Sequence, residues 1–113
     1  MTIEELAAYG ANTKEGLQRC MNNESFYLRL VKMIPGDTNF QKLYDAVDTG
    51  DLASAFEAAH AIKGSTGNLA LTPIFVPVSE ITELLRARTE TDYSAFIDAI
   101  RDGRDRLQAL CEE

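Results

Sequence analysis

The sequence predicts an all-α fold, an antiparallel four-helix bundle with additional short helices at its N-terminus. Apolar residues recur at three- and four-residue spacings through most of the chain, which is the period of helices that bury one face. No stretch alternates apolar and polar residues in the manner of a strand. Capping residues, glycines and prolines interrupt the apolar pattern at short intervals, so the helices are joined by short connections.

Short helices are expected in the first 35 residues. Thr2 followed three residues later by Glu5 forms a capping box that opens the first helix, and Gly10 is a suitable stop. A second helix follows and is broken by Asn22-Asn23, which also offers a cap for a third helix with a broad apolar face. Pro35-Gly36 ends that third helix.

Four longer helices make up the expected bundle. Gly50 closes the first of them, and Asp51 caps the second. In the last, Gly103 falls on or near the buried stripe, where a close helix crossing and a local bend explain it equally well. The expected bounds of the four helices are residues 38–49, 51–67, 77–88 and 92–111.

The start of the third long helix depends on two prolines. Thr72-Pro73 suits a helix start, with threonine as the cap and proline in the first turn. Pro77 comes only four residues later, and inside the same helix it would remove a backbone hydrogen bond. Either a short turn covers residues 73–76 and the main helix begins at Pro77, or one helix is kinked there.

Length and charge limit the range of functions. The 113 residues suit a single domain spanning 1–113, and 45% hydrophobic with 26% charged residues is ordinary for a globular protein. Eighteen acidic residues against 11 basic ones give a net charge of −7, which argues against nucleic acid and anionic membranes as partners. No apolar run approaches the roughly 18 residues that cross a bilayer.

The cysteines and the N-terminus favour a cytoplasmic protein. Cys20 and Cys111 both fall at apolar helical positions, where a reduced cysteine packs as a small hydrophobic residue. One histidine and two distant cysteines have no metal-ligand spacing, so no metal is expected. The N-terminus lacks the basic and then apolar pattern of a signal peptide. The start at Met1 favours a free-standing protein, although a domain cut from a longer chain would look the same.

The residues whose side chains could take part in a reaction lie in the segment 59–69, which contains His60, the only histidine of the chain. If residues 51–67 are helical, at about 100° per residue the apolar side chains share one stripe. His60, Lys63, Gly64 and Gly67 then share a different stripe, so the histidine faces water. Its neighbours on that face are a cation and two residues without side chains.

This arrangement suits a histidine that carries a phosphoryl group. A neutral imidazole is a nucleophile near pH 7, and Lys63 at i+3 is close enough to stabilise the added negative charge. Gly64 leaves room for the active site of another protein, at a cost of about 1 kcal/mol relative to alanine. The alternatives are an ordinary surface histidine and lysine. Gly67 and Asn68 are better explained as a structural helix end.

The pattern His60-x-x-Lys63-Gly64-x-x-Gly67-Asn68-Leu69 resembles the signature of histidine-containing phosphotransfer (HPt) domains. The similarity extends to residues 9–28 and 48–51, so it covers nearly the whole chain. It implies a helical bundle that shuttles phosphoryl groups between receiver domains in a two-component phosphorelay. It also implies phosphorylation on an exposed ring nitrogen of the histidine, support of the phosphate by the lysine and clearance for the partner at Gly64. The chain departs from the family around Pro73 and Pro77, where a smooth helix is usual.

The resemblance further implies a carrier rather than a complete enzyme. Near the histidine the sequence shows no acid/base pair, no carboxylate cluster for Mg²⁺ and no nucleotide-binding loop, so no cofactor is expected on this chain. A response-regulator receiver domain would bring its own aspartate and Mg²⁺, and a hybrid histidine kinase is a further candidate partner. Binding would be transient and the protein monomeric. Candidates for an apolar docking ring are Ala61, Leu71, Phe40 and Tyr44. The alternative function is a helical adaptor that binds receiver or kinase domains without carrying phosphate.

Overall fold

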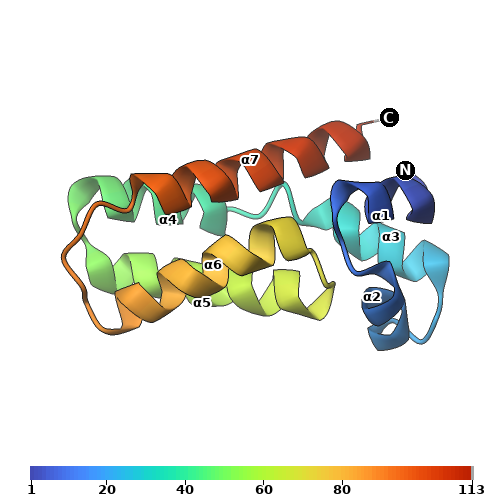
Figure 1. The fold of residues 1–113 in the computed structure, drawn as a ribbon, viewed down its shortest axis with the longest axis horizontal. Coiled ribbons are helices and arrows are strands. Elements are labelled where there is room, and N and C mark those ends of the chain that lie inside the picture. Colours follow the sequence, from blue (N-terminus) through green and yellow to red (C-terminus); the bar gives the residue numbers. More distant parts are fainter. Residues whose placement is uncertain (113) are drawn as a thin grey trace.

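The computed structural model describes residues 1–112, and this part of the chain is entirely helical outside its turns and loops (Figure 1). The all-α prediction is therefore confirmed. The helices are α1 (Ile3–Tyr9), α2 (Thr13–Arg19), α3 (Glu24–Met33), α4 (Asn39–Thr49), α5 (Leu52–Asn68), α6 (Thr72–Arg86) and α7 (Ser94–Cys111).

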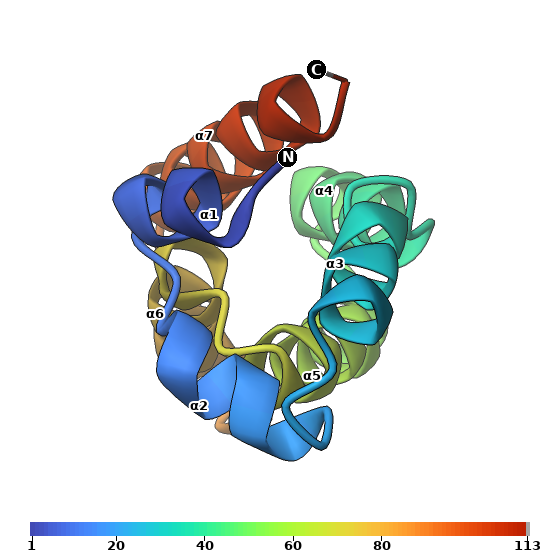
Figure 2. The ribbon, with the colours of Figure 1, turned by 90° about the vertical axis from the view of Figure 1, so that its right-hand side faces the viewer.

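The four longer helices run side by side along the long axis of the molecule (Figure 1). Helix α5 packs against both α4 and α6, and α6 packs against α7. The three short helices gather at one end, where both chain termini also lie. Figure 2 looks onto that end and shows α1–α3 in front of the ring formed by α4–α7. This is the predicted bundle with additional N-terminal helices.

Local sequence signals account for most of the helix boundaries. The predicted capping box is present, since the Glu5 amide donates to Thr2 Oγ1 at 3.1 Å and the Thr2 amide donates to the Glu5 carboxylate at 3.0 Å. Gly50 closes α4 in the left-handed conformation, with φ of 76°. Side-chain caps that accept a backbone amide also open α2, α3 and α5, from Asn12, Asn23 and Asp51.

The start of α6 differs from the prediction. Of the two alternatives for Pro73 and Pro77, a single helix through Pro77 is the one found, so the expected bounds of 77–88 are wrong at the beginning. The helix starts at Thr72 and has Leu71 rather than Thr72 as its N-cap. Ile74 and Val78, on either side of Pro77, are both fully buried. Their packing in the core holds the first turn of the helix in place although Pro77 lacks an N–H group.

The carbonyl that Pro77 leaves without its helical partner is that of Pro73, and α7 crosses α6 there. A Cβ atom built on Gly103 would lie 3.0 Å from the Pro73 carbonyl oxygen and 3.1 Å from the Ile74 side chain. A side chain there would press on the Pro73 backbone, so the close crossing of α6 and α7 explains Gly103. The Gly103 carbonyl in turn accepts a hydrogen bond from the Tyr9 hydroxyl at 2.7 Å, which ties α1 to α7.

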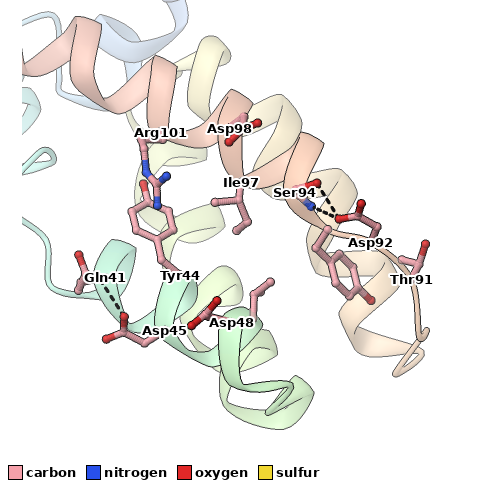
Figure 3. A pocket seen from close by; sticks show the side chains of 12 residues that line it. Gln41, Tyr44, Asp45, Asp48, Thr91, Asp92, Ser94, Ile97, Asp98 and Arg101 are labelled. Carbon is pink, nitrogen blue, oxygen red and sulfur yellow. Dashed lines mark hydrogen bonds between the residues drawn. The ribbon is translucent and has the colours of Figure 1, made fainter.

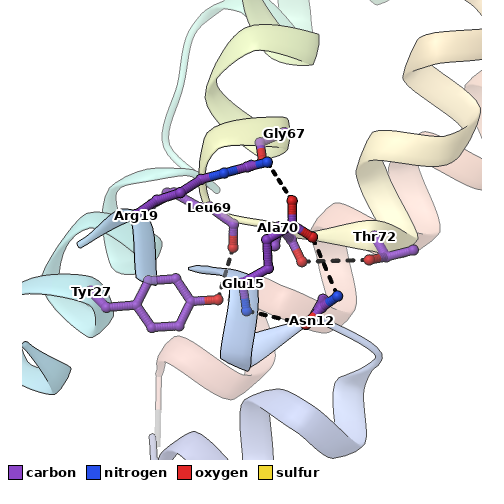
Figure 4. A network of polar contacts seen from close by, with 8 residues as sticks. All are labelled: Asn12, Glu15, Arg19, Tyr27, Gly67, Leu69, Ala70 and Thr72. Carbon is purple, nitrogen blue, oxygen red and sulfur yellow. Dashed lines mark hydrogen bonds and ion pairs between the residues drawn. The ribbon is translucent and has the colours of Figure 1, made fainter. Parts of the chain in front are cut away.

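Polar contacts tie the short helices to the turn between α5 and α6 (Figure 4). The backbone N–H of Asn12 donates to the Ala70 carbonyl at 2.9 Å. The Arg19 guanidinium donates to the Gly67 carbonyl and forms an ion pair with Glu15. These contacts join α2 to the end of the histidine helix.

Tyr27 provides the buried link from α3 to the same turn. The ring is fully buried, and its hydroxyl donates to the Leu69 carbonyl at 2.8 Å (Figure 4). Gly16 makes room for this ring, because a Cβ atom there would lie 2.4 Å from the tyrosine hydroxyl oxygen. Burial raises the pKa of Tyr27 to about 12.

Replacing Tyr27 with phenylalanine is expected to lower the free energy of unfolding by about 1–3 kcal/mol, because the buried Leu69 carbonyl loses its donor. Urea denaturation at pH 7 measures the loss. The raised pKa adds a second signature. The hydroxyl stabilises the fold below pH 10, and this contribution falls as the pH rises towards 12, since the unfolded chain ionises first. The difference between the two proteins should shrink over that interval, and an unchanged difference would contradict this account.

The cysteines are free thiols, as predicted. Cys20 is buried and belongs to the core, whereas Cys111 at the end of α7 is only partly buried. Burial raises the pKa of the Cys111 thiol.

Candidate functional site

His60 lies near the middle of α5, and its side chain is exposed. Ala59 and Ile62, on the opposite face of the helix, have no exposed surface. The predicted orientation of the histidine towards water is therefore confirmed. The structure presents an imidazole to solvent from a helix that packs against α4 and α6.

The imidazole stacks on an aromatic ring from the preceding turn. The His60 and Phe56 ring centroids are 5.7 Å apart, and the planes differ by 18°. Phe56 is half-buried, and the guanidinium carbons of Arg86 and Arg88 lie 5.0 and 5.4 Å from its ring centroid. The stack limits the orientations of the histidine, and the arginines bring two positive charges from the end of α6 and the residues after it.

Lys63, one turn after the histidine, is partly buried and forms an ion pair across to α6. Its Nζ lies 3.7 Å from Glu83 Oε1. The other carboxylate oxygen, Glu83 Oε2, lies 3.4 Å from Arg86 Nε. One carboxylate thus contacts Lys63, one turn after His60, and Arg86, which lies against the Phe56 ring.

The two glycines of the motif have different surroundings. A Cβ atom on Gly64 would meet nothing within 4 Å, so the space beside the histidine is open. A Cβ atom on Gly67 would lie 2.9 Å from the Phe75 ring, so this glycine allows α6 to pack against the end of α5. Helix α5 ends at Asn68, one residue beyond the predicted bound, which agrees with a structural role for Gly67 and Asn68.

The open surface at Gly64 continues into a shallow hollow of about 580 Å³ between α2, α5 and α6. The side chains that line it are mixed, with Arg19 and Glu15 on one side and Phe75 and Val76 on the other. Val76 is among the most exposed large apolar residues of the described chain, at 46%. A partner that covers His60 therefore has a partly apolar surface to contact alongside it.

Two of the four residues predicted for a docking ring are in the core. Leu71 is fully buried as the N-cap of α6, and Phe40 is 2% exposed beneath the Arg104 guanidinium, so both predictions are wrong. Ala61 is exposed beside His60 and remains a candidate. The error for Leu71 follows from the unexpected start of α6, which turns this residue inward.

Tyr44 lies at a separate hollow of about 540 Å³ between α4 and the beginning of α7 (Figure 3). The Arg101 guanidinium carbon is 4.5 Å from its ring centroid. His60 is not among the residues that line this hollow. Tyr44 is therefore a contact between α4 and α7 rather than part of the histidine site.

Phe56, Glu83 and Arg86 are the site residues that the sequence analysis missed. Phe56 could have been found, because a residue at i−4 lies next to the histidine on a helix. Glu83 and Arg86 come from another helix, and their place depends on how α6 packs against α5. In residues 1–112, no group of three or more His, Cys, Asp or Glu side chains could hold a metal ion.

No helix in the described part of the chain is both long enough and apolar enough to cross a membrane.

A family model described as Hpt domain matches residues 36–110. Searches of curated proteins and of solved structures returned no match. The matched segment covers about two thirds of the chain and contains α4–α6, with His60, and all but the last residue of α7. The similarity predicted for residues 9–28 lies outside it and stays a prediction. The chain, with its helical bundle and the exposed histidine on α5, belongs to the Hpt domain family.

Proposed function

We propose that His60 accepts a phosphoryl group from the aspartate of one receiver domain and donates it to another in a two-component phosphorelay. Membership of the Hpt domain family supports phosphotransfer in two-component signalling. The observation that supports His60 as the carrier is its exposure beside the open space at Gly64. It is also the only histidine in the chain.

The proposed transfer exchanges one bond to phosphorus for another. An unprotonated ring nitrogen of His60 attacks the phosphorus of an aspartyl phosphate in line with the departing carboxylate oxygen. The N–P bond forms, the O–P bond breaks, the aspartate leaves as a carboxylate, and the imidazole releases one proton to solvent. The reverse sequence returns the phosphoryl group to an aspartate.

The residues around His60 would position the ring and balance charge. Phe56 limits rotation of the imidazole through the stacking contact. Lys63, one turn after His60, and Arg86, against the Phe56 ring, would supply positive charge where the phosphoryl group adds two negative charges. The aspartate and Mg²⁺ would come from the receiver domain, so this chain serves as a phosphocarrier that binds no cofactor of its own.

Docking would use the surface that surrounds the histidine. Ala61 and Gly64 are exposed on α5, and Val76 adds apolar area from α6. A small contact of this kind favours a transient complex, which suits a carrier that meets more than one partner. Receiver domains are the proposed partners, with a hybrid histidine kinase as a further one. A cytoplasmic, monomeric protein suits this role.

The experiment that tests the proposal is transfer of labelled phosphate from several phosphorylated receiver domains to the purified protein. The expected label is labile in acid and stable in base, as for an N–P bond, and maps to the peptide that contains His60. Measurable binding to the receivers without any label would instead favour the adaptor function.

A further inference from the structure

Glu83 forms ion pairs with two cations, Lys63 on α5 and Arg86 on α6. Its two carboxylate oxygens lie 3.7 Å from Lys63 Nζ and 3.4 Å from Arg86 Nε. The Arg86 guanidinium also lies against Phe56, on which the imidazole of His60 stacks. One acidic side chain on α6 therefore forms ion pairs with both a cation from α5 and a cation from its own helix.

We propose that Glu83 is a positioning residue that holds Lys63 and Arg86 in the unphosphorylated protein and gives them up to the phosphoryl group on His60. This inference rests on the proposed function of His60. The carboxylate is replaced as the partner of the two cations when the dianionic phosphoryl group arrives. Glu83 thereby sets how strongly the protein retains that group.

Charge and exposure support such an exchange. The Glu83 side chain is 60% exposed and that of Arg86 is 51% exposed, so water can hydrate both charged groups when the pair separates. Exposed pairs of this kind are weak, and a dianion competes well against a single carboxylate. The Lys63 side chain is 32% exposed, and its place one turn after His60 needs only a rotamer change to leave Glu83.

Removing the carboxylate should therefore favour the phosphorylated protein. In Glu83→Gln the two cations have no competing partner, and the equilibrium with an aspartyl phosphate moves towards His60. The expected shift is about two- to fivefold, the range that corresponds to weak exposed ion pairs. The fold should be unaffected for the same reason.

The experiment measures the equilibrium share of label on His60 after mixing with one phosphorylated receiver domain. Glu80→Gln is the matched control, because Glu80 is also exposed on α6 and forms no ion pair among the described residues. The combination Lys63→Met with Arg86→Gln, with and without Glu83→Gln, separates two mechanisms. Exchange of cations predicts no effect of Glu83→Gln in that background, whereas plain repulsion between Glu83 and the phosphoryl group predicts that the effect persists.

Chemical phosphorylation gives a test that needs no partner protein. Phosphoramidate transfers its phosphoryl group to an imidazole: its P–N bond breaks, the new N–P bond forms, and ammonia leaves with the imidazole proton as ammonium. The Arg86 Nε resonance of ¹⁵N-labelled protein should move when wild-type His60 is phosphorylated in this way. In unphosphorylated Glu83→Gln the chemical shift of Arg86 Nε should already differ from the wild-type value. In Glu80→Gln it should equal the wild-type value.

The outcomes separate the inference from the proposed function. If receivers transfer label but the equilibrium share of label on His60 is equal in wild type and Glu83→Gln, the inference is overturned and the function stands. A shift that persists without Lys63 and Arg86 would also overturn it. No transfer from receivers, together with the Arg86 response to phosphoramidate, would overturn the function and support the role of Glu83.

Discussion

Replacing His60 with glutamine is expected to abolish phosphorylation of the protein completely. Glutamine has a similar reach and can form hydrogen bonds, but its amide nitrogen is not a nucleophile at neutral pH. No other histidine can substitute, because the chain contains only one. Label transfer from a phosphorylated receiver domain measures the loss, which should reach the background of the assay.

The fold of this variant should be intact. His60 is exposed and its contact with Phe56 is at the surface, so the free energy of unfolding should change by less than about 1 kcal/mol. Binding of a receiver domain should also persist, which separates loss of chemistry from loss of docking. Acid-labile label retained by His60→Gln would place the phosphoryl group on another residue and contradict the proposal.

The features that the sequence predicts well are those that local chemistry determines. The capping box at Thr2, the αL glycine at the end of α4 and the Asp51 cap each depend on residues within one helical turn. The orientation of His60 follows from periodicity along α5 alone. Short-range signals therefore predict both the boundaries of most helices and the exposed face of the central one.

The features that the sequence predicts poorly depend on packing between helices. The first turn of α6 forms despite Pro77 because Ile74 and Val78 are buried, and no local signal shows that burial. The inward turn of Leu71 follows from the same start. Glu83 reaches Lys63 only through the register of α6 against α5. Helix periodicity gives the face of each helix but not the register between two of them.

Phe56 shows the limit of assigning residues to two distinct stripes. At about 100° per residue it lies only about 40° from His60, although it also borders the buried stripe. The structure leaves it half-buried, with its ring both against the core and beneath the imidazole. Residues at the boundary of a buried face can thus belong to the site as well as to the core.

Enlarging Gly64 is expected to reduce phosphotransfer strongly while the fold becomes more stable. A Cβ atom there meets nothing within 4 Å, so Gly64→Ala removes the entropic cost of a helical glycine and should raise the free energy of unfolding by about 0.5–1 kcal/mol. Gly64→Leu projects a longer side chain into the space beside His60. It should lower the rate of transfer from a receiver domain on the order of a hundredfold, because the reacting atoms can no longer approach in line.

The opposite directions of these two effects make the prediction specific. In a less stable variant, slowed transfer could result either from unfolding or from blocked docking. Slowed transfer in a protein that unfolds at a higher urea concentration points to blocked docking alone. Ala109→Leu places the same leucine side chain at an exposed position of α7 and should leave transfer unchanged. Phosphoramidate is small enough to reach the imidazole of Gly64→Leu, so chemical phosphorylation should continue while transfer from the receiver fails. Equal transfer rates for Gly64→Leu and wild type would show that the partner does not cover this face of α5.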